Sequence, residues 1–188
     1  MTRTDTGKRS DELASILISE ARLKRRVREL GQQLEQDFAN RELVVVSLLN
    51  GTIMFLADLV RSLNLPLRLD FVGVSSYRHG AESRGLVFTK ELRLDVCGRD
   101  VLLVDDILDT GRTLHAVLAK LGQLSPATIK TCVLLDKPSR RVQGIEADYV
   151  GFKVPDVFVV GYGLDFAERF RNLPFVAVLK PEAYENAR

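Results

Sequence analysis

The amino-acid sequence predicts an α/β fold in which helices flank an open, twisted and mostly parallel sheet. One observation is a set of continuous apolar runs rich in β-branched residues, of which Leu43–Leu49 (LVVVSLL) is the clearest. Such runs are typical of parallel strands that are covered on both faces. A second observation is that segments with helical periodicity separate these runs, which predicts right-handed crossovers between parallel strands. The length of 188 residues suits one domain.

The first predicted element is an amphipathic helix that begins at Ser19, a favourable N-cap residue, after a polar tail at residues 1–10. Its apolar residues recur at spacings of three and four, which places them on one helical face: Leu23, Val27, Leu30, Leu34 and Phe38. The opposite face carries the basic residues Arg22, Lys24, Arg25, Arg26 and Arg28. We interpret this face as solvated, although a basic helix can also bind RNA.

A first strand, helix and strand follow in order. Asn50-Gly51 ends the strand at Leu43–Leu49, and the next helix is predicted from the spacing of Ile53, Leu56, Leu59, Val60 and Leu63. A second apolar strand is predicted at residues 67–74.

The polar segment at residues 75–84 is interpreted as a long exposed loop, a kind of segment that often covers an active site. Residues 87–94 alternate between apolar and polar side chains and predict a hairpin strand.

The second half of the chain repeats this alternation. A strand at residues 101–104 precedes a helix that carries Leu114, Val117, Leu118 and Leu121 and ends at Gly122. Another apolar strand is predicted at residues 129–135, and short strands are predicted at 149–152, 157–160 and 175–179.

Composition and charge exclude several classes of protein. The apolar fraction of 46%, the charged fraction of 28% and the net charge of +2 are those of a globular protein without a nucleic-acid or membrane partner. No apolar run approaches the roughly 18 residues of a membrane span, and the polar start does not resemble a secretory signal. Cys97 and Cys132 belong to no CxxC or Cys/His cluster, which disfavours a zinc site and a disulfide framework. We therefore expect a cytoplasmic protein.

The most informative stretch is VLLVDDILDTGRTL at residues 101–114. Asp105 and Asp106 follow the predicted strand, where ligands bind in open parallel sheets. Two buried carboxylates need partners, and ribose hydroxyls or Mg²⁺ would satisfy them. The turn at residues 109–113 (DTGRT) presents backbone amides at a helix N-terminus, which predicts an anion site. Because it lacks the Gly-Lys-Ser/Thr ending of a triphosphate loop, a monophosphate group is the expected ligand.

This stretch resembles the phosphoribosyl-pyrophosphate signature of type I phosphoribosyltransferases, and its DTGRT ending most resembles their hypoxanthine-guanine branch. LLNGTIMFLADL resembles the family's pyrophosphate loop and the helix after it, and Ser75-Ser76-Tyr77 resembles the start of its lid. LLDKPSRR, DYVGFKVPDVFVVGYGLDF and ERFRNLP resemble its purine-binding region and C-terminus. The resemblance implies a core at about residues 38–150, a small hood from about 10–20 and 151–188, and a flexible lid at about 75–86 that includes Ser76 and Tyr77.

The resemblance also implies how phosphoribosyl pyrophosphate binds. Asp105 and Asp106 are expected to bind the ribose hydroxyls. The 5-phosphate is expected to contact the turn formed by Asp109, Thr110, Gly111, Arg112 and Thr113. Pyrophosphate is expected to meet Asn50, Gly51 and Arg171, although some family members have a lysine at the position of Asn50. The family has a cis peptide bond in this turn, and the matching bond is Leu49–Asn50.

The purine is expected to lie near Lys137, Phe158, Val159 and Asp165. By resemblance, Asp109 is the general acid/base at the purine N7 atom. The Lys137 ammonium donates to the O6 atom of a 6-oxopurine, which disfavours adenine because adenine has an amino donor there. Phe158 stacks on the base, and the backbone of Val159 meets its edge. Mg²⁺ is the expected cofactor, with Asp165, Asp105 and Asp106 as its ligands.

The implied reaction is a purine salvage step that converts hypoxanthine or guanine and phosphoribosyl pyrophosphate into IMP or GMP and pyrophosphate. The resemblance implies a homodimer or a homotetramer. Two alternatives stay open. A regulatory protein of the same fold would only sense phosphoribosyl pyrophosphate, with RNA bound by the basic helix. A related enzyme would prefer xanthine, since Lys137 reads only the 6-oxo group.

Overall fold

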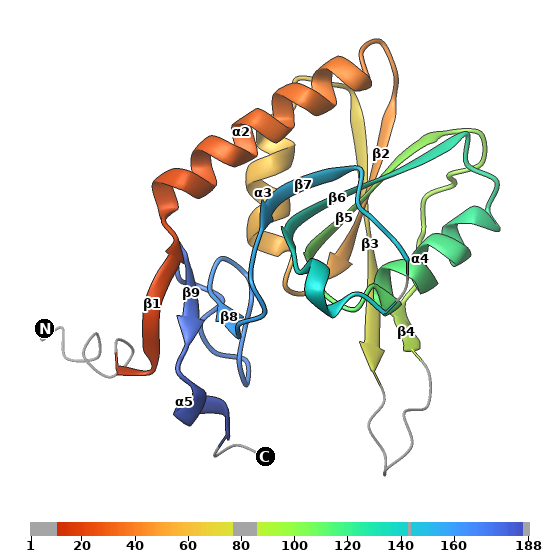
Figure 1. The fold of residues 1–188 in the computed structure, drawn as a ribbon. Coiled ribbons are helices and arrows are strands. Elements are labelled where there is room, and N and C mark those ends of the chain that lie inside the picture. Colours follow the sequence, from red (N-terminus) through yellow and green to blue (C-terminus); the bar gives the residue numbers. More distant parts are fainter. Residues whose placement is uncertain (1–10, 77–85, 143, 186–188) are drawn as a thin grey trace, which may run out of the picture.

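The computed structural model describes residues 11–76, 86–142 and 144–185, which form a large and a small sheet with helices around the larger one (Figure 1). The strand order is β4-β3-β2-β5-β6-β7 in the larger sheet and β1-β9-β8 in the smaller. The larger sheet consists of β2 (Leu43–Leu49), β3 (Leu67–Ser76), β4 (Leu86–Lys90), β5 (Asp100–Leu108), β6 (Thr128–Asp136) and β7 (Tyr149–Lys153). The smaller sheet, here called the hood sheet, consists of β1 (Leu13–Ile18), β8 (Val159–Val160) and β9 (Val176–Leu179). The helices are α2 (Glu20–Asp37), α3 (Ile53–Arg61), α4 (Arg112–Gly122), the 3₁₀ helix η1 (Pro138–Arg140) and α5 (Pro181–Glu185).

The larger sheet is parallel except at β4, which pairs antiparallel with β3. The chain passes from β2 through α3 to β3 on one side, and then continues with β5 on the other side of β2. The strand order therefore reverses between β2 and β5, which is where open parallel sheets bind their ligands. This arrangement confirms the predicted α/β fold class.

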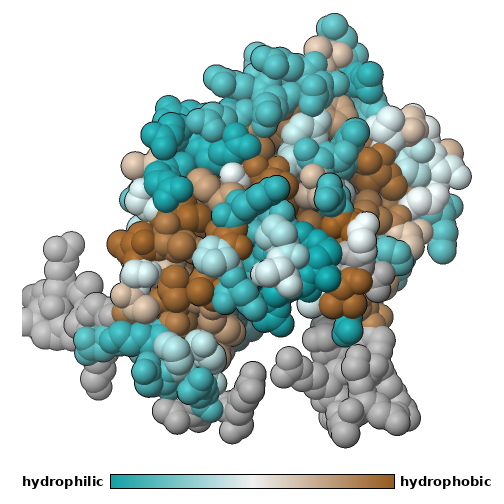
Figure 2. All heavy atoms as spheres, in the orientation of Figure 1, coloured by the Kyte–Doolittle hydropathy of each residue, from teal (hydrophilic) through white to brown (hydrophobic). Residues whose placement is uncertain are grey.

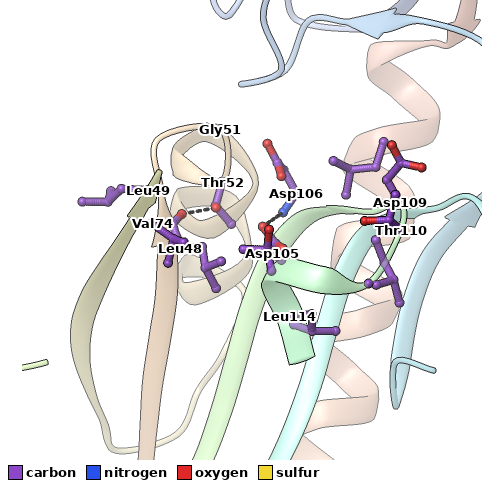
Figure 3. A pocket seen from close by; sticks show the side chains of 14 residues that line it. Leu48, Leu49, Gly51, Thr52, Val74, Asp105, Asp106, Asp109, Thr110 and Leu114 are labelled. Atoms are coloured by element: carbon purple, nitrogen blue, oxygen red, sulfur yellow. Dashed lines mark hydrogen bonds between the residues drawn. The ribbon is translucent and has the colours of Figure 1, made fainter. Parts of the chain in front are cut away.

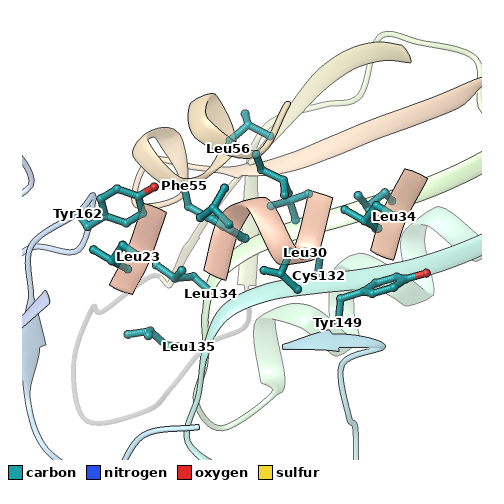
Figure 4. Packing of buried hydrophobic residues seen from close by; sticks show 14 of the residues in the cluster. Leu23, Leu30, Leu34, Phe55, Leu56, Cys132, Leu134, Leu135, Tyr149 and Tyr162 are labelled. Atoms are coloured by element: carbon teal, nitrogen blue, oxygen red, sulfur yellow. The ribbon is translucent and has the colours of Figure 1, made fainter. Parts of the chain in front are cut away.

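Both faces of the larger sheet are covered by helices. Val45 and Leu102 pack in a cluster with α2 and α3 on one face, whereas Val44 and Val101 pack with α4 on the other. Figure 4 shows the first cluster, in which Leu30 of α2 lies among side chains from α3 and β6. Because neighbouring residues of one strand are buried on opposite faces, the central strands are apolar at successive positions.

Helix α2 begins after Ser19, whose hydroxyl accepts a 3.4 Å hydrogen bond from the Arg22 amide. Hydrophilic residues cover the outer side of α2 in Figure 2. Arg26 is an exception, because its guanidinium donates to the carbonyls of Val150 at 2.8 Å and Gly151 at 2.9 Å. The prediction of a solvated face was therefore wrong for Arg26, whose hydrogen bonds connect α2 to the edge strand β7.

The ends of several strands differ from the prediction. β5 continues to Leu108, beyond the predicted end at residue 104, because it stays paired with β6 as far as the Leu108–Asp136 pair. β4 ends at Lys90 rather than at residue 94. The amides of Arg93 and Leu94 bind the Asp70 carboxylate instead of a strand partner.

Three further elements were not predicted from the sequence, namely β1, η1 and α5. β1 forms by pairing antiparallel with β9, near the other end of the chain. In the described part of the chain, no helix has both the length and the apolarity that a bilayer crossing requires. Of the expected lid, Ser76 ends β3, whereas Tyr77 and the rest of residues 77–85 lie outside the described residues.

Candidate functional site

The two central strands of the larger sheet separate at their carboxyl ends. Pairing between β2 and β5 stops at Ser47–Val104, whereas β5 remains paired with β6 as far as Leu108. Asp105 and Asp106 therefore lie inside β5, on the part whose β2 side is unpaired. A pocket of about 320 Å³ opens there between the turns that follow β2 and β5 (Figure 3). We call it the first pocket.

Asp105 and Asp106 bring two adjacent carboxylates to the first pocket. Asp105 is 8% exposed, and its Oδ1 atom accepts a 2.9 Å hydrogen bond from the Asp106 amide. Burial, and after it the neighbouring charge of Asp106, raise the pKa of Asp105 well above its usual range. Burial also raises the pKa of Asp106, against the opposing effects of hydrogen bonds and of Arg171. A cation or a pair of hydroxyl donors would stabilise these carboxylates in their charged form.

The turn after β2 approaches this acid pair closely. A Cβ atom at Gly51 would lie 1.7 Å from Asp106 Oδ2, so a side chain there would displace the carboxylate. Thr52 is buried and its hydroxyl donates to the Leu48 carbonyl. The Leu49–Asn50 peptide bond is cis, as in the family that the sequence resembles. Asn50 itself is exposed and is absent from the pocket lining.

The turn after β5 forms the opposite wall of the first pocket and opens helix α4. Its N-cap residue is Gly111, with a φ of 84°, a conformation that favours glycine. Asp109, Thr110 and Thr113 also line the pocket. Backbone amides in the first turn of a helix have no partner within the helix, so they can bind an anionic group. Arg112 is exposed, and its side chain does not contribute to the lining.

A second pocket of about 830 Å³ adjoins the first, because Ile107 and Asp109 line both. The predicted purine-binding residues all line this second pocket: Lys137, Phe158, Val159 and Asp165. The structure thus brings together residues that are far apart in the sequence, and Asp109 lies at the junction of the two pockets.

Lys137 places a buried ammonium group in the second pocket. The residue is 6% exposed, and its Nζ atom donates to the Val157 carbonyl at 2.7 Å. Burial lowers the pKa of Lys137, while the charges of Asp109 and Asp156 act in the opposite direction. The bond to Val157 uses one of the three N–H donors of the ammonium, so a ligand oxygen can accept another.

Two arginines that follow Lys137 hold Asp109 in place. Arg140 Nε lies 3.1 Å from Asp109 Oδ1, a buried atom that accepts no well-aligned hydrogen bond from the described residues. Arg141 donates to the Asp109 carbonyl at 2.7 Å and pairs with Asp136 at the end of β6. Sequence reasoning missed both arginines. The signal that could have found them is Pro138, which starts the 3₁₀ helix that directs them back toward Asp109.

Aromatic rings line another part of the second pocket. Phe158 is 38% exposed, meets Phe166 edge to face at 5.5 Å, and stacks on Tyr184 of α5 at 5.0 Å between ring centroids. Phe158 was predicted, whereas Phe166 and Tyr184 were not. A partly exposed aromatic ring in a pocket offers a stacking surface for a planar ligand.

Asp165 and Arg171 form an ion pair, with 2.8 Å between Oδ1 and Nη2. Arg171 lines neither of these pockets but a third cavity, although its positive charge acts to lower the pKa of Asp106. Within the described ranges, no three His, Cys, Asp or Glu residues gather in a cluster that could hold a metal ion. A metal at Asp105 and Asp106 would therefore need further oxygen ligands, such as those of a substrate.

Comparison with known proteins agrees with this geometry. The chain matches the family model of the phosphoribosyl transferase domain over residues 15–167. It is 46% identical over 175 residues to the bifunctional protein TilS/HprT of Listeria innocua serovar 6a, an alignment that spans 93% of this chain but 27% of that protein. It is 44% identical over 177 residues to the hypoxanthine-guanine phosphoribosyltransferase of Staphylococcus aureus (strain Mu50), spanning 94% of this chain and 99% of that protein.

A solved structure agrees as well. The crystal structure of a hypoxanthine phosphoribosyltransferase from Staphylococcus aureus matches with a TM-score of 0.91 and 41% identity, and covers 96% of this chain and 99% of that one. The family model, the sequence relatives and the fold lead to the same assignment. The chain belongs to the phosphoribosyl transferase domain family.

Proposed function

We propose that the protein is a purine salvage enzyme that transfers the 5-phosphoribosyl group of phosphoribosyl pyrophosphate to hypoxanthine or guanine. The products are IMP or GMP and pyrophosphate. The observation that carries this proposal is the position of Asp109, which lines both the pocket with the anion-binding turn and the pocket with Lys137 and Phe158. The similarity to a hypoxanthine-guanine phosphoribosyltransferase over nearly the whole chain supports a 6-oxopurine as the acceptor.

In this proposal, phosphoribosyl pyrophosphate lies in the first pocket. The turn at residues 109–113 binds the 5-phosphate through its backbone amides and the hydroxyls of Thr110 and Thr113. The ribose hydroxyls donate to Asp105 and Asp106, which gives partners to two carboxylates whose burial disfavours their charge. Pyrophosphate is assigned to the turn at Gly51, where the missing side chain lets the backbone approach Asp106, and Arg171 supplies a positive charge.

The purine base lies in the second pocket. Phe158 offers its ring for stacking, and the Lys137 ammonium donates to the purine O6 atom. Adenine has an amino group at that position, so its binding would bring two donors together. Asp109 accepts the proton of the purine N7 atom while N9 forms its bond to C1 of the ribose. The C1–O bond to pyrophosphate breaks in the same reaction, and pyrophosphate leaves with the bonding electron pair. Both substrates are thereby held side by side, which removes much of the entropic barrier to their reaction.

Mg²⁺ is the proposed cofactor, and the acid pair fits it. Burial raises the pKa values of Asp105 and Asp106, which disfavours their charged form, and a divalent cation would stabilise that form. We assign the ion to Asp105 and Asp106 together with substrate oxygens. The third predicted ligand, Asp165, forms no metal-binding cluster with them in the described part of the chain and pairs with Arg171 instead. When bound, the ion would neutralise charge on the departing pyrophosphate.

We further propose that the protein is cytoplasmic and acts on small molecules as a homodimer or homotetramer. An apolar groove of about 510 Å³ between α3 and β3 includes Ile53, 44% exposed, and Leu69, 38% exposed. Exposed apolar surface of this kind often marks contacts between copies of a chain. Light scattering during size-exclusion chromatography tests this proposal, and a monomer at micromolar concentration would contradict it.

The substitution Asp109→Asn tests the proposed chemistry. An amide cannot exchange a proton with N7 as a carboxylate does, so we expect kcat to fall by about 10²–10⁴-fold. The Kd for phosphoribosyl pyrophosphate should change by less than about threefold, because the amides of the turn remain. Asp95→Asn is the control, since Asp95 is exposed and lines neither pocket, and it should leave kcat nearly unchanged. Unchanged turnover of the Asp109 variant would contradict the proposed role.

A further inference from the structure

Tyr162 has a backbone conformation that is unusual for a residue with a side chain. Its φ is 52°, and it lies between Gly161 and Gly163, whose φ values are 99° and 101°. Glycine adopts this left-handed region readily, whereas tyrosine does so only where its surroundings stabilise it. Tyr162 is 7% exposed, so the stabilising contacts are those of a buried side chain.

The hydroxyl of Tyr162 makes one of these contacts. It donates a 2.6 Å hydrogen bond to Asp58 Oδ2 of helix α3, while Asp58 Oδ1 pairs with Arg61. In Figure 4 the hydroxyl end of Tyr162 points toward α3. Burial, and after it the bond to Asp58, raise the pKa of the Tyr162 hydroxyl, so it remains a donor at neutral pH. Tyr162, which lines a cavity together with Arg171, is thus hydrogen-bonded to helix α3, and α3 directly follows the turn at residues 50–52.

Gly163 shows that the two segments also meet directly. A Cβ atom at this position would lie 1.9 Å from the Gly51 carbonyl oxygen. Gly163 is bonded to Arg171 twice, since its amide donates to the Arg171 carbonyl at 2.9 Å and its own carbonyl accepts from Arg171 Nη1 at 2.9 Å. The position of the Arg171 guanidinium relative to Gly51 therefore depends on how this segment is seated on the turn.

We propose that the Tyr162–Asp58 hydrogen bond is a positioning contact that seats Gly163 on Gly51 and thereby places Arg171 for pyrophosphate. Tyr162 lines neither substrate pocket but a separate cavity of about 290 Å³ with Asp58 and Arg171, so it acts through other residues. The inference rests on the proposed function, because it assigns pyrophosphate to the part of the first pocket that Gly51 lines.

The chain contains a matched control for this contact. Tyr149 donates to Asp37 Oδ2 at 2.6 Å, the same length as the Tyr162–Asp58 bond, and ties β7 to the end of α2. Tyr149 lies at the other end of the same apolar cluster (Figure 4) and lines neither substrate pocket. Tyr162→Phe and Tyr149→Phe each remove one such hydroxyl and keep the ring, so a purely structural role would affect both variants alike.

The test is the Kd for inorganic pyrophosphate with Mg²⁺, measured by calorimetry on the wild-type protein and both variants. We expect Tyr162→Phe to weaken pyrophosphate binding by roughly tenfold, the scale of one hydrogen bond to a charged group. Tyr149→Phe should change that Kd by less than about twofold, even if it lowers the midpoint of urea unfolding as much as Tyr162→Phe does. In addition, Asp58→Ala should weaken binding about as much as Tyr162→Phe, and the double variant should add little.

Equal Kd values for the two tyrosine variants would overturn the proposal, and so would a wild-type protein that does not bind pyrophosphate. The outcome is separable from that of the proposed function. A protein that forms no nucleotide from any purine would contradict the proposed reaction, whereas the pyrophosphate comparison would still decide the role of Tyr162.

Discussion

Asp105 and Asp106 lie in the part of β5 that is no longer paired with β2, and both residues line the first pocket. Burial raises the pKa of both, which means that the folded protein holds protons there more tightly than the unfolded chain does. Such groups are retained at ligand sites because the ligand, and not the protein, completes their surroundings. Their effect on the free protein is a loss of stability at neutral pH.

This loss is measurable with Asp105→Asn. Between the ordinary carboxyl pKa near 4 and the raised folded-state pKa, the folded protein binds more protons than the unfolded chain, so the free energy of unfolding falls as pH rises. The amide removes this effect, and we expect a gain of roughly 0.5–2 kcal/mol at pH 7 without Mg²⁺, together with a loss of activity. Urea unfolding from pH 4 to pH 8 measures it. A variant less stable than the wild type at pH 7 would contradict this account.

The sequence predicted the residues whose position depends on local order alone. Asp105, Asp106 and Asp109 follow one another along a strand and a turn, so the motif was enough to place them in one pocket. Tyr184 reaches the second pocket through a tertiary contact with Phe158, and no local sequence pattern predicts such a contact. The roles assigned to the site residues are therefore best tested by substitution.

At the scale of elements, Asp70 holds β3 against the segment that follows β4. Asp70 is 6% exposed, and its carboxylate accepts hydrogen bonds from the amides of Phe71, Arg93 and Leu94 and from Lys90 Nζ of β4. Burial alone would raise the pKa of Asp70, but these hydrogen bonds outweigh it and lower the pKa to about 2. The charged form of this residue is therefore part of the fold.

Asp70→Asn should destabilise the protein at neutral pH. A lowered folded-state pKa contributes stability that is present above the ordinary pKa near 4 and is lost as pH falls through about 2. We expect a loss of roughly 2 kcal/mol at pH 7 and a smaller one at pH 2.5, measured by urea unfolding. Asp95→Asn is the control, because Asp95 is exposed and its carboxylate accepts a hydrogen bond from the amide of the exposed residue Cys97. Equal stability of the Asp70 variant and the wild type at pH 7 would show that the carboxylate contributes nothing.

Elements with a complete apolar pattern were predicted with accurate bounds, as β2 shows. β5 was predicted too short because Asp105 and Asp106 are polar, although Asp105, Ile107 and Leu108 continue to pair with β6. β1 (LASILI) was not predicted because much of it is exposed and it is held by β9. Runs of apolar residues in a sequence thus predict the central strands of a sheet better than its edge strands.

At the scale of the whole molecule, the second pocket lies between the hood sheet and the larger sheet. Ala14 and Val178 of the hood sheet line it together with Ile107 and Lys137 from the carboxyl ends of β5 and β6. A single apolar cluster includes Val159 and other residues of the hood as well as α2, α3 and the central strands. The sequence predicted the hood only through family resemblance, because pairs such as Leu13 with Leu179 join opposite ends of the chain.

The most direct test of this account is nucleotide formation by the purified protein with phosphoribosyl pyrophosphate and Mg²⁺. Hypoxanthine, guanine, xanthine and adenine are supplied separately, and the nucleoside monophosphate and pyrophosphate are measured. We predict that hypoxanthine yields IMP and guanine yields GMP, each with one pyrophosphate released per nucleotide formed. The kcat/KM for adenine should be at least about 10²-fold lower than for these bases, because the buried Lys137 ammonium can only donate a hydrogen bond at position 6 of the purine. Formation of no nucleotide from hypoxanthine or guanine, or a preference for adenine, would contradict the account.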